Sequence, residues 1–257
     1  MSTEKIINLA AYAGKILLQS GAEIYRVEET MNKICTAFNV KEAESFVTPT
    51  GIIISITGED EKITSTIKRI QVRTVDLRKI SEVNDLSRTL QYKNFSLEEV
   101  ADKLKKIDNE KKHSDLFLIF FSAVAAGFFT LIFGGTFRDF SVSFFIGIII
   151  KIFSIIISRL EINDFFLNMV GGAIAAFIAL LFKKLGVVVY LDKTIIGSIM
   201  LLVPGLAITN AVRDTIAGDL VSGVSRALDA FFTAVAIAAG TGLVFKIWIN
   251  FFGGTGL

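Results

Sequence analysis

Proline, glycine and paired charges occur together in one part of an otherwise apolar stretch. Pro204 and Gly205 lie inside an apolar run. Proline removes a backbone hydrogen bond and its ring clashes with the preceding turn, so the pair predicts a kinked or broken helix. Irregular backbone at membrane depth is tolerated where it is buried in protein or lines a wet cavity, and broken helix ends bind small ions and zwitterions. The alternative interpretation is a kink that serves packing alone.

Charged side chains crowd the sequence downstream of this break. Arg213, Asp214 and Asp219 come first, and Arg226 and Asp229 follow three residues apart, where a helix would let them pair. Charges inside membrane spans are costly and often mark a solute path. Arginine can bind a carboxylate through two hydrogen bonds, and aspartate can bind an ammonium group. The segment therefore predicts a solute path, and the alternative is loop charges with a structural ion pair.

The elements that must position these residues are mostly apolar helices. Of the 257 residues 52% are hydrophobic, yet the first 115 hold 18 of the 27 Lys and Arg and 18 of the 25 Asp and Glu. This sharp fall in the density of charged residues predicts a domain boundary, with an α/β domain over 1–114 and a transmembrane bundle over 115–257. About 20 apolar residues cross a bilayer. The predicted spans are 116–135, 140–158, 165–182, 194–212 and 221–249.

The expected fold is therefore a multi-pass α-helical membrane protein of about five transmembrane helices with an N-terminal cytoplasmic α/β domain. Its orientation follows from the charges that flank the first span. Arg138 alone follows this span closely, whereas five lysines precede it: Lys103, Lys105, Lys106, Lys111 and Lys112. The positive-inside rule places the N-terminal domain in the cytoplasm.

The N-terminal domain alternates between helical and strand patterns. Strand-type residues flank Pro49-Thr50-Gly51, which predicts a hairpin turn. Two sequences, Ser20-Gly21-Ala22-Glu23 and Ser96-Leu97-Glu98-Glu99, have the form of capping boxes that open helices. The predicted elements are helices over 6–17, 24–38, 77–90 and 97–107, strands over 44–48 and 52–57, and a third strand within 63–75.

Several classes of function lack their signatures. The net charge of +2 gives no electrostatic reason to expect nucleic-acid binding. Cys35 is the single cysteine, so neither an intramolecular disulfide nor a cysteine metal cage is predicted, and no metal or cofactor is expected. The sequence has no phosphate-binding loop and no G-x-S-x-G elbow, which leaves ATP-driven transport and serine hydrolysis without support from those motifs.

Motifs along nearly the whole chain resemble those of the threonine/serine exporter (ThrE) family. Residues 19–30, QSGAEIYRVEET, resemble its N-terminal motif, and residues 45–51 and 83–88 resemble the next two. The membrane signature is matched by Val203-Pro204-Gly205, Asn210-Ala211, Arg213-Asp214, Gly218-Asp219, Ser222-Gly223 and Arg226.

The resemblance implies export of small polar metabolites across the cytoplasmic (inner) membrane, either threonine and serine or succinate-like dicarboxylates. We expect a secondary exporter that the proton motive force drives. The resemblance also implies the larger, YjjP-like half of a two-component exporter, an oligomer with a short YjjB-like membrane partner. The predicted substrate-binding residues are Pro204, Gly205, Asn210, Arg213, Asp214, Asp219, Arg226 and Asp229. The predicted gating or docking residues are Glu23, Arg26, Glu28, Thr48, Thr50 and Arg88.

Two other functions remain open at this point. The cytoplasmic domain could be a membrane-anchored enzyme or sensor that uses Glu23, Glu28 or Thr50. Five spans with interior charges are more than an anchor needs, which counts against an enzyme. The protein could also be a channel whose pore forms only with its partner.

Overall fold

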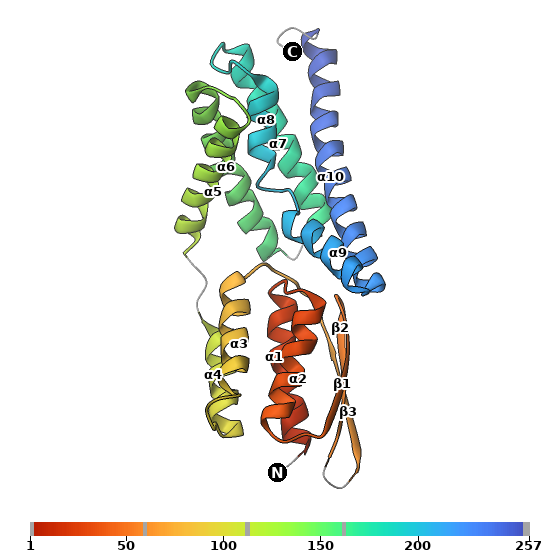
Figure 1. Ribbon diagram of the computed structural model, residues 1–257. Coiled ribbons are helices and arrows are strands. Elements are labelled where there is room, and N and C mark those ends of the chain that lie inside the picture. The colour runs from red at the N-terminus through yellow and green to blue at the C-terminus, as the bar shows by residue number, and fades with distance from the viewer. Residues whose placement is uncertain (1–2, 59–60, 111–113, 161–162, 254–257) are drawn as a thin grey trace. The chain divides into compact units, whose positions relative to one another are not determined.

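The computed structural model of the protein describes residues 3–58, 61–110, 114–160 and 163–253 (Figure 1). The contacts between Cα atoms divide the chain into two compact units. The first unit consists of Met1–Lys111 and Gly205–Leu228, and the second consists of Lys112–Pro204 and Asp229–Leu257. The segment Gly205–Leu228 therefore folds with the N-terminal part of the chain, although the apolar helices flank it on both sides in the sequence.

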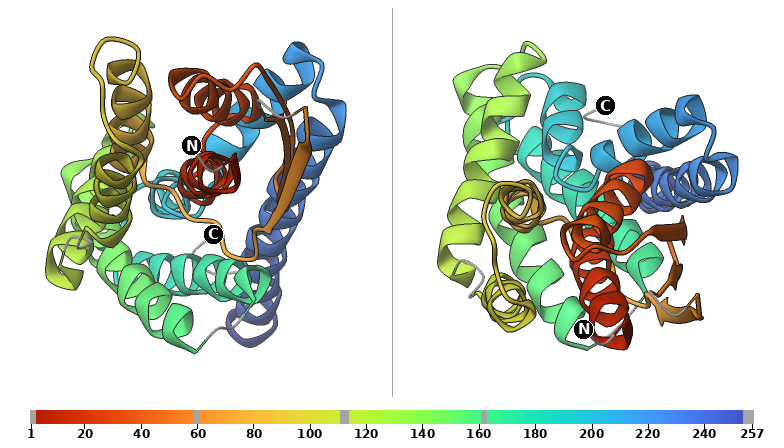
Figure 2. Two further views of the ribbon diagram at one scale, coloured as in Figure 1. Left: turned by 90° about the horizontal axis from the view of Figure 1, so that it is seen from below. Right: turned by 60° about the horizontal axis from the view of Figure 1, so that its bottom comes forward.

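The N-terminal part of the first unit is built in three layers, with α1 in the middle (Figures 1 and 2). A sheet lies on one side of the α1–α2 pair and the α3–α4 pair lies on the other. Its elements are α1 (Thr3–Gln19), α2 (Ile24–Ala37), β1 (Glu42–Thr48), β2 (Gly51–Thr57), β3 (Ile63–Arg69), α3 (Leu77–Thr89) and α4 (Leu97–Asn109). The predicted helices and strands of this domain are confirmed to within a few residues.

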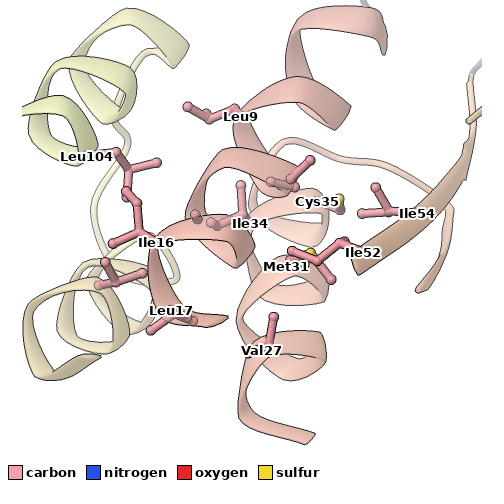
Figure 3. Close-up of a cluster of buried hydrophobic side chains, with 14 of the residues drawn as sticks. Leu9, Ile16, Leu17, Val27, Met31, Ile34, Cys35, Ile52, Ile54 and Leu104 are labelled. Atoms are coloured by element: carbon pink, nitrogen blue, oxygen red, sulfur yellow. The ribbon is translucent and has the colours of Figure 1, made fainter. Parts of the chain in front are cut away.

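The core of this unit forms where α1 and α2 meet the sheet and α4. Ile16 and Leu17 on α1, Met31 on α2, Ile52 on β2 and Leu104 on α4 are almost fully buried in one cluster. Figure 3 shows Leu104 beside Ile16, and Met31 beside Ile52. Apolar side chains on several faces of α1 explain its central place, because a helix that is apolar all round must be covered on all sides.

The sheet is antiparallel in the order β1-β2-β3. Thr48 pairs with Gly51, so Pro49 and Thr50 form the predicted hairpin turn. One face of the sheet packs on the helices through Val47, Ile52 and other buried side chains. The sheet thus holds the end of β1 against α2.

The two predicted capping boxes have different outcomes. Ser96 and Glu99 form the predicted reciprocal hydrogen bonds at the start of α4. The box predicted at Ser20 is wrong, because the N-cap residue of α2 is Glu23 and it makes no side-chain capping bond. The Glu23 carboxylate binds arginine side chains instead, and a residue far along the chain caps the helix, as described below.

The second unit is helical. Its elements are α5 (Asp115–Ile132), α6 (Phe137–Arg159), α7 (Asp164–Lys184), α8 (Leu191–Ile199) and the greater part of α10 (Leu220–Phe252). Among the described residues, four helices are long and apolar enough to cross a membrane: α5, α6, α7 and α10. They correspond to the predicted spans 116–135, 140–158, 165–182 and 221–249.

The fourth predicted span, 194–212, is not a continuous helix. The helix α8 ends at Ile199 and α9 (Gly205–Ala217) begins six residues later, so the break predicted at Pro204 is confirmed and the continuous span is corrected to two short helices. Proline cannot donate a backbone hydrogen bond, and its ring disfavours helical backbone at Val203. The break coincides with the change from the second unit to the first.

Small residues let the long helices of the second unit approach closely. A methyl group added at Gly240 on α10 would lie 1.8 Å from the backbone oxygen of Met169 on α7, and one added at Gly172 would lie 2.6 Å from the oxygen of Ile237. Both distances are far below contact distance, so α7 and α10 pack backbone against backbone. Packing of this kind is typical of membrane helices, which gain little from burying apolar surface away from lipid.

Candidate functional site

In the first unit, α9 and the first turns of α10 pack on the loop that joins α1 to α2. We call this region the α2–α9 junction, which comprises residues 20–26, 205–217 and 220–228. Gly21 has a φ of +90°, which favours glycine, and a methyl group there would lie 3.2 Å from both Leu206 and the Thr74 backbone oxygen. A glycine is therefore needed where α9 approaches the loop.

Three polar side chains of the junction bind the backbone of this loop. The Asn210 amide donates to the Gly21 carbonyl at 2.9 Å, and the Arg226 guanidinium donates to the Ala22 carbonyl at 2.7 Å. The Ile24 backbone amide donates to the Asp214 carboxylate at 3.3 Å. The first amides of a helix have no intrahelical acceptor, and negative charge at that end is favourable. Asp214 thus provides at the start of α2 the contact that the predicted Ser20 box does not make.

Asp214 and Arg226 also form a buried ion pair. The Arg226 Nε lies 3.0 Å from the Asp214 carboxylate, and the exposed fractions of the two side chains are 9% and 0%. Gly223 allows α10 to approach α9 here, because a methyl group at that position would clash with Thr215. A buried pair of this kind is strongly destabilised when one partner is removed, because the other charge remains uncompensated.

Glu23 lies between two arginines. One carboxylate oxygen accepts from Arg26 Nε at 2.8 Å, and the other pairs with Arg213 of α9. Burial by itself would raise the pKa of Glu23, but the hydrogen bonds from its own backbone amide and from Arg26, together with the two positive charges, lower it below the ordinary value. Glu23 is therefore an ion-pairing anion at neutral pH, which does not suit a general base.

A second group of predicted residues lies where α2 faces the end of β1. The Val47 amide donates to the Glu28 carboxylate at 3.1 Å, and the Thr48 and Thr50 hydroxyls lie 3.4 Å apart. Burial raises the pKa of Glu28, the Val47 amide opposes the shift, and the charge of Asp219 adds to it. Asp219, at the turn between α9 and α10, therefore lies near enough to Glu28 to affect its protonation.

The remaining predicted residues fall into two places. Arg88 of α3 lines a cavity of about 340 Å³ together with Glu23, Arg26 and Asn210. Pro204 is the last residue of its segment of the second unit, and Asp229 is the first of the next. The pair predicted between Arg226 and Asp229 remains a prediction. The structure thus brings most of the predicted membrane set and the predicted cytoplasmic set into the same unit.

The second unit contains a buried polar cluster that the sequence analysis did not select. The Asp139 carboxylate forms a capping box with Thr136 at the start of α6, and it accepts from the Val189 and Tyr190 amides at 2.7 and 3.2 Å. Ser143 links α5 to α8, since it accepts from Thr130 at 2.7 Å and donates to the Thr194 carbonyl at 3.2 Å. The spacing of Thr136 and Asp139 was a visible signal for the cap. These groups bind one another, which suits a structural role.

The four apolar helices of spanning length among the described residues are consistent with a multi-pass membrane protein that also carries a small three-stranded sheet. A family model described as "Putative threonine/serine exporter" (ThrE) matches residues 8–248. The match covers nearly the whole chain, so the protein belongs to the ThrE family, which is a family of exporters rather than of enzymes.

Similar proteins carry two kinds of name. The "Probable threonine/serine exporter" of Mycobacterium tuberculosis is 22% identical over 250 residues, which are 93% of this chain and 46% of that protein. The "Threonine/serine exporter" of Corynebacterium glutamicum is 25% identical over 246 residues, which are 93% of this chain and 50% of that protein. The chain thus spans about half the length of these relatives. No solved structure is significantly similar to it.

A third relative has a length similar to that of this chain. The "Probable succinate transporter subunit YjjP" of Klebsiella aerogenes is 22% identical over 250 residues, which are 95% of this chain and 94% of that protein. This relative of similar length is therefore named as a subunit, and the relatives named as exporters are about twice as long as the matched region.

Proposed function

We propose that the protein is the larger membrane subunit of a secondary exporter that moves small polar metabolites out of the cell. The solutes are amino acids of the threonine and serine type or succinate-like dicarboxylates, and the proton motive force drives their export. Membership of the ThrE family supports export, and the names of the relatives define the range of solutes.

The exporter includes a short, YjjB-like membrane partner and more than one copy of the chain. Two observations support a partner. Two relatives of similar length, from Klebsiella aerogenes and Escherichia coli, are named as transporter subunits. The relatives named as exporters are about twice as long as the matched region.

The observation that carries the proposal is the break between α8 and α9, followed directly by the charged residues of the α2–α9 junction. The break at Pro204, directly after the apolar helix α8, favours a solute path, because broken helices commonly bind the solute in transporters. Asn210, Asp214 and Arg226 bind the α1–α2 loop in this structure. Release of these contacts would free the same polar groups for a solute, so we propose that the junction works as a gate.

The first unit lies on the cytoplasmic side of the cytoplasmic membrane. The lysines that precede α5 support this orientation through the positive-inside rule. An ion pair at 2.6 Å joins Asp115, at the start of α5, to Arg159, at the end of α6. The first two spans therefore begin and end at the same face of the second unit.

Transport by proteoliposomes would test the function. The chain would be reconstituted with its short partner, and uptake of labelled threonine, serine and succinate would be measured with and without a proton gradient. We expect saturable, gradient-dependent uptake, and at least about tenfold slower uptake for Arg213→Gln, if this residue contributes one charge-assisted hydrogen bond to the path. Arg159→Gln, at an exposed ion pair, is the matched control and should transport normally.

Two outcomes would contradict the proposal. If none of the three solutes crossed under any ion gradient, the exporter assignment would be wrong for these solutes. If uptake rose linearly without saturation and a conductance accompanied it, a partner-dependent channel would be the better description.

A further inference from the structure

The cavity beside the α2–α9 junction has walls from three elements of the first unit. Arg26 comes from α2, Asp85 and Arg88 come from α3, and Asn210 comes from α9. Its volume of about 340 Å³ lies at the lower end of the range for ligand-binding pockets, which suits a small metabolite. The cavity is therefore a candidate binding site.

The charges that line the cavity balance one another. Two carboxylates, of Glu23 and Asp85, face two guanidinium groups, of Arg26 and Arg88. Glu23 and Arg26 already pair with each other at 2.8 Å. Within the described ranges of the chain, the side chains of Asp85 and Arg88 take part in no hydrogen bond and no ion pair, although the charge of Arg88 adds to that of Lys33 in lowering the pKa of Glu29 on α2. One negative and one positive group, three residues apart on the same helix face, are thus available to a ligand.

The rest of the lining indicates the size and polarity of that ligand. Leu77, Ile80 and Leu206 add apolar surface beside the charges. We propose that the cavity binds a small zwitterion of the α-amino acid type. Arg88 would bind its carboxylate, Asp85 its ammonium group, and the apolar residues its short side chain. A dicarboxylate fits less well, because Asp85 would repel its second negative charge.

Binding at this site would also stabilise the junction. Leu206 and Asn210 belong to α9, whereas the charged residues belong to α2 and α3. A ligand that contacts all three helices binds only when α9 is docked, so ligand binding and docking must favour each other. The inference deepens the proposed function, on which its meaning for transport rests, but binding can be measured without transport.

Calorimetric titration of the full chain in detergent would test the site, with L-threonine, L-serine and succinate as probes. We expect saturable binding of an amino acid and at least tenfold weaker binding of succinate. Asp85→Asn and Arg88→Gln should each weaken amino-acid binding by about tenfold or more, the effect of losing one charge-assisted hydrogen bond. Both side chains are exposed, so the unfolding temperature of the chain should not change.

Matched controls are available on another exposed surface. Asp102→Asn and Lys105→Gln make the same charge changes on α4, away from the cavity, and should leave binding unchanged. The inference is overturned if no amino acid binds, if succinate binds as tightly, or if the α3 variants bind like the α4 variants. Binding without transport would count against the proposed function alone, and transport without binding would count against this inference alone.

Discussion

At the residue scale, the Asp214–Arg226 ion pair is the most deeply buried charge pair of the α2–α9 junction among the described residues. We expect Asp214→Asn to lower the free energy of unfolding of the first unit by about 3 kcal/mol, because it removes one charge of a buried ion pair. Chemical denaturation of the detergent-solubilised chain would measure the change. The double variant Asp214→Asn/Arg226→Gln should lose less than the sum of the two single variants, whereas an additive result would show that the pair is not coupled.

Glu23 and Glu28, five residues apart, should respond to pH in opposite directions. The folded-state pKa of Glu23 is lowered, so its contribution to stability is present above its ordinary pKa and is lost as the pH falls through the folded value. The folded-state pKa of Glu28 is raised, so its ionisation destabilises the fold as the pH rises through and above its ordinary pKa.

The opposite pKa shifts of Glu23 and Glu28 can be tested with two matched variants. Glu23→Gln should reduce stability most at neutral pH and less in acid. Glu28→Gln should raise stability at neutral pH relative to its effect in acid, since it keeps an acceptor for the Val47 amide without the buried charge. Unfolding temperatures of both variants between about pH 4 and 8, the range around an ordinary glutamate pKa, would measure the difference. Parallel pH profiles for the two variants would contradict it.

At the element scale, the approach of α7 to α10 can be tested with two glycines on one helix. Gly240→Ala would place a methyl group 1.8 Å from the Met169 oxygen, so the helices must separate, at a cost of about 3 kcal/mol as for overpacked cores. Gly242→Ala has open space around it and should be neutral or stabilising by up to about 1 kcal/mol, because alanine is the better helix former. Equal melting temperatures for the two variants would show that this close packing is absent.

Elements that depend on neighbouring residues were predicted from sequence patterns, whereas contacts between distant elements were not. Apolar periodicity identified the helices of the first unit, and Pro204 identified the break, because both depend on neighbouring residues. The capping box predicted at Ser20 was wrong because a distant residue caps the helix instead. Its local pattern fitted, but the acceptor for the Ile24 amide comes from Asp214, 190 residues later. A partner so distant leaves no local pattern, so the docking of α9 could not be predicted from sequence periodicity.

At the scale of the whole molecule, α10 belongs to both units. Its first turns, up to Leu228, pack with the first unit, and the residues from Asp229 onward belong to the second. That second part of the helix is about 24 residues, or roughly 36 Å, which is enough to cross the hydrocarbon of a bilayer.

The sequence predicted the candidate site as two separate sets of residues, because composition and fold divide the chain at different positions. Composition places Arg213 and Arg226 among apolar helices, whereas the fold packs them with the N-terminal unit.

The proposed orientation gives a last prediction, which depends on Cys35. This single cysteine is buried, and burial raises the pKa of its thiol to about 12, so it should not react with maleimides. Single new cysteines can therefore be labelled selectively without removing it. Asp102→Cys on α4 and Ile216→Cys on α9, both exposed in the first unit, should react with an impermeant maleimide only in inside-out vesicles.

Leu185→Cys, at the exposed end of α7, should show the opposite pattern and react in right-side-out vesicles. If α5 starts on the cytoplasmic side, α5, α6 and α7 cross three times and place this residue outside. The chain must then return across the membrane through α8 and the Pro204 break before α9 begins. Labelling of Ile216→Cys and Leu185→Cys from the same side would contradict this, and would mean that the broken segment only enters the membrane without crossing it.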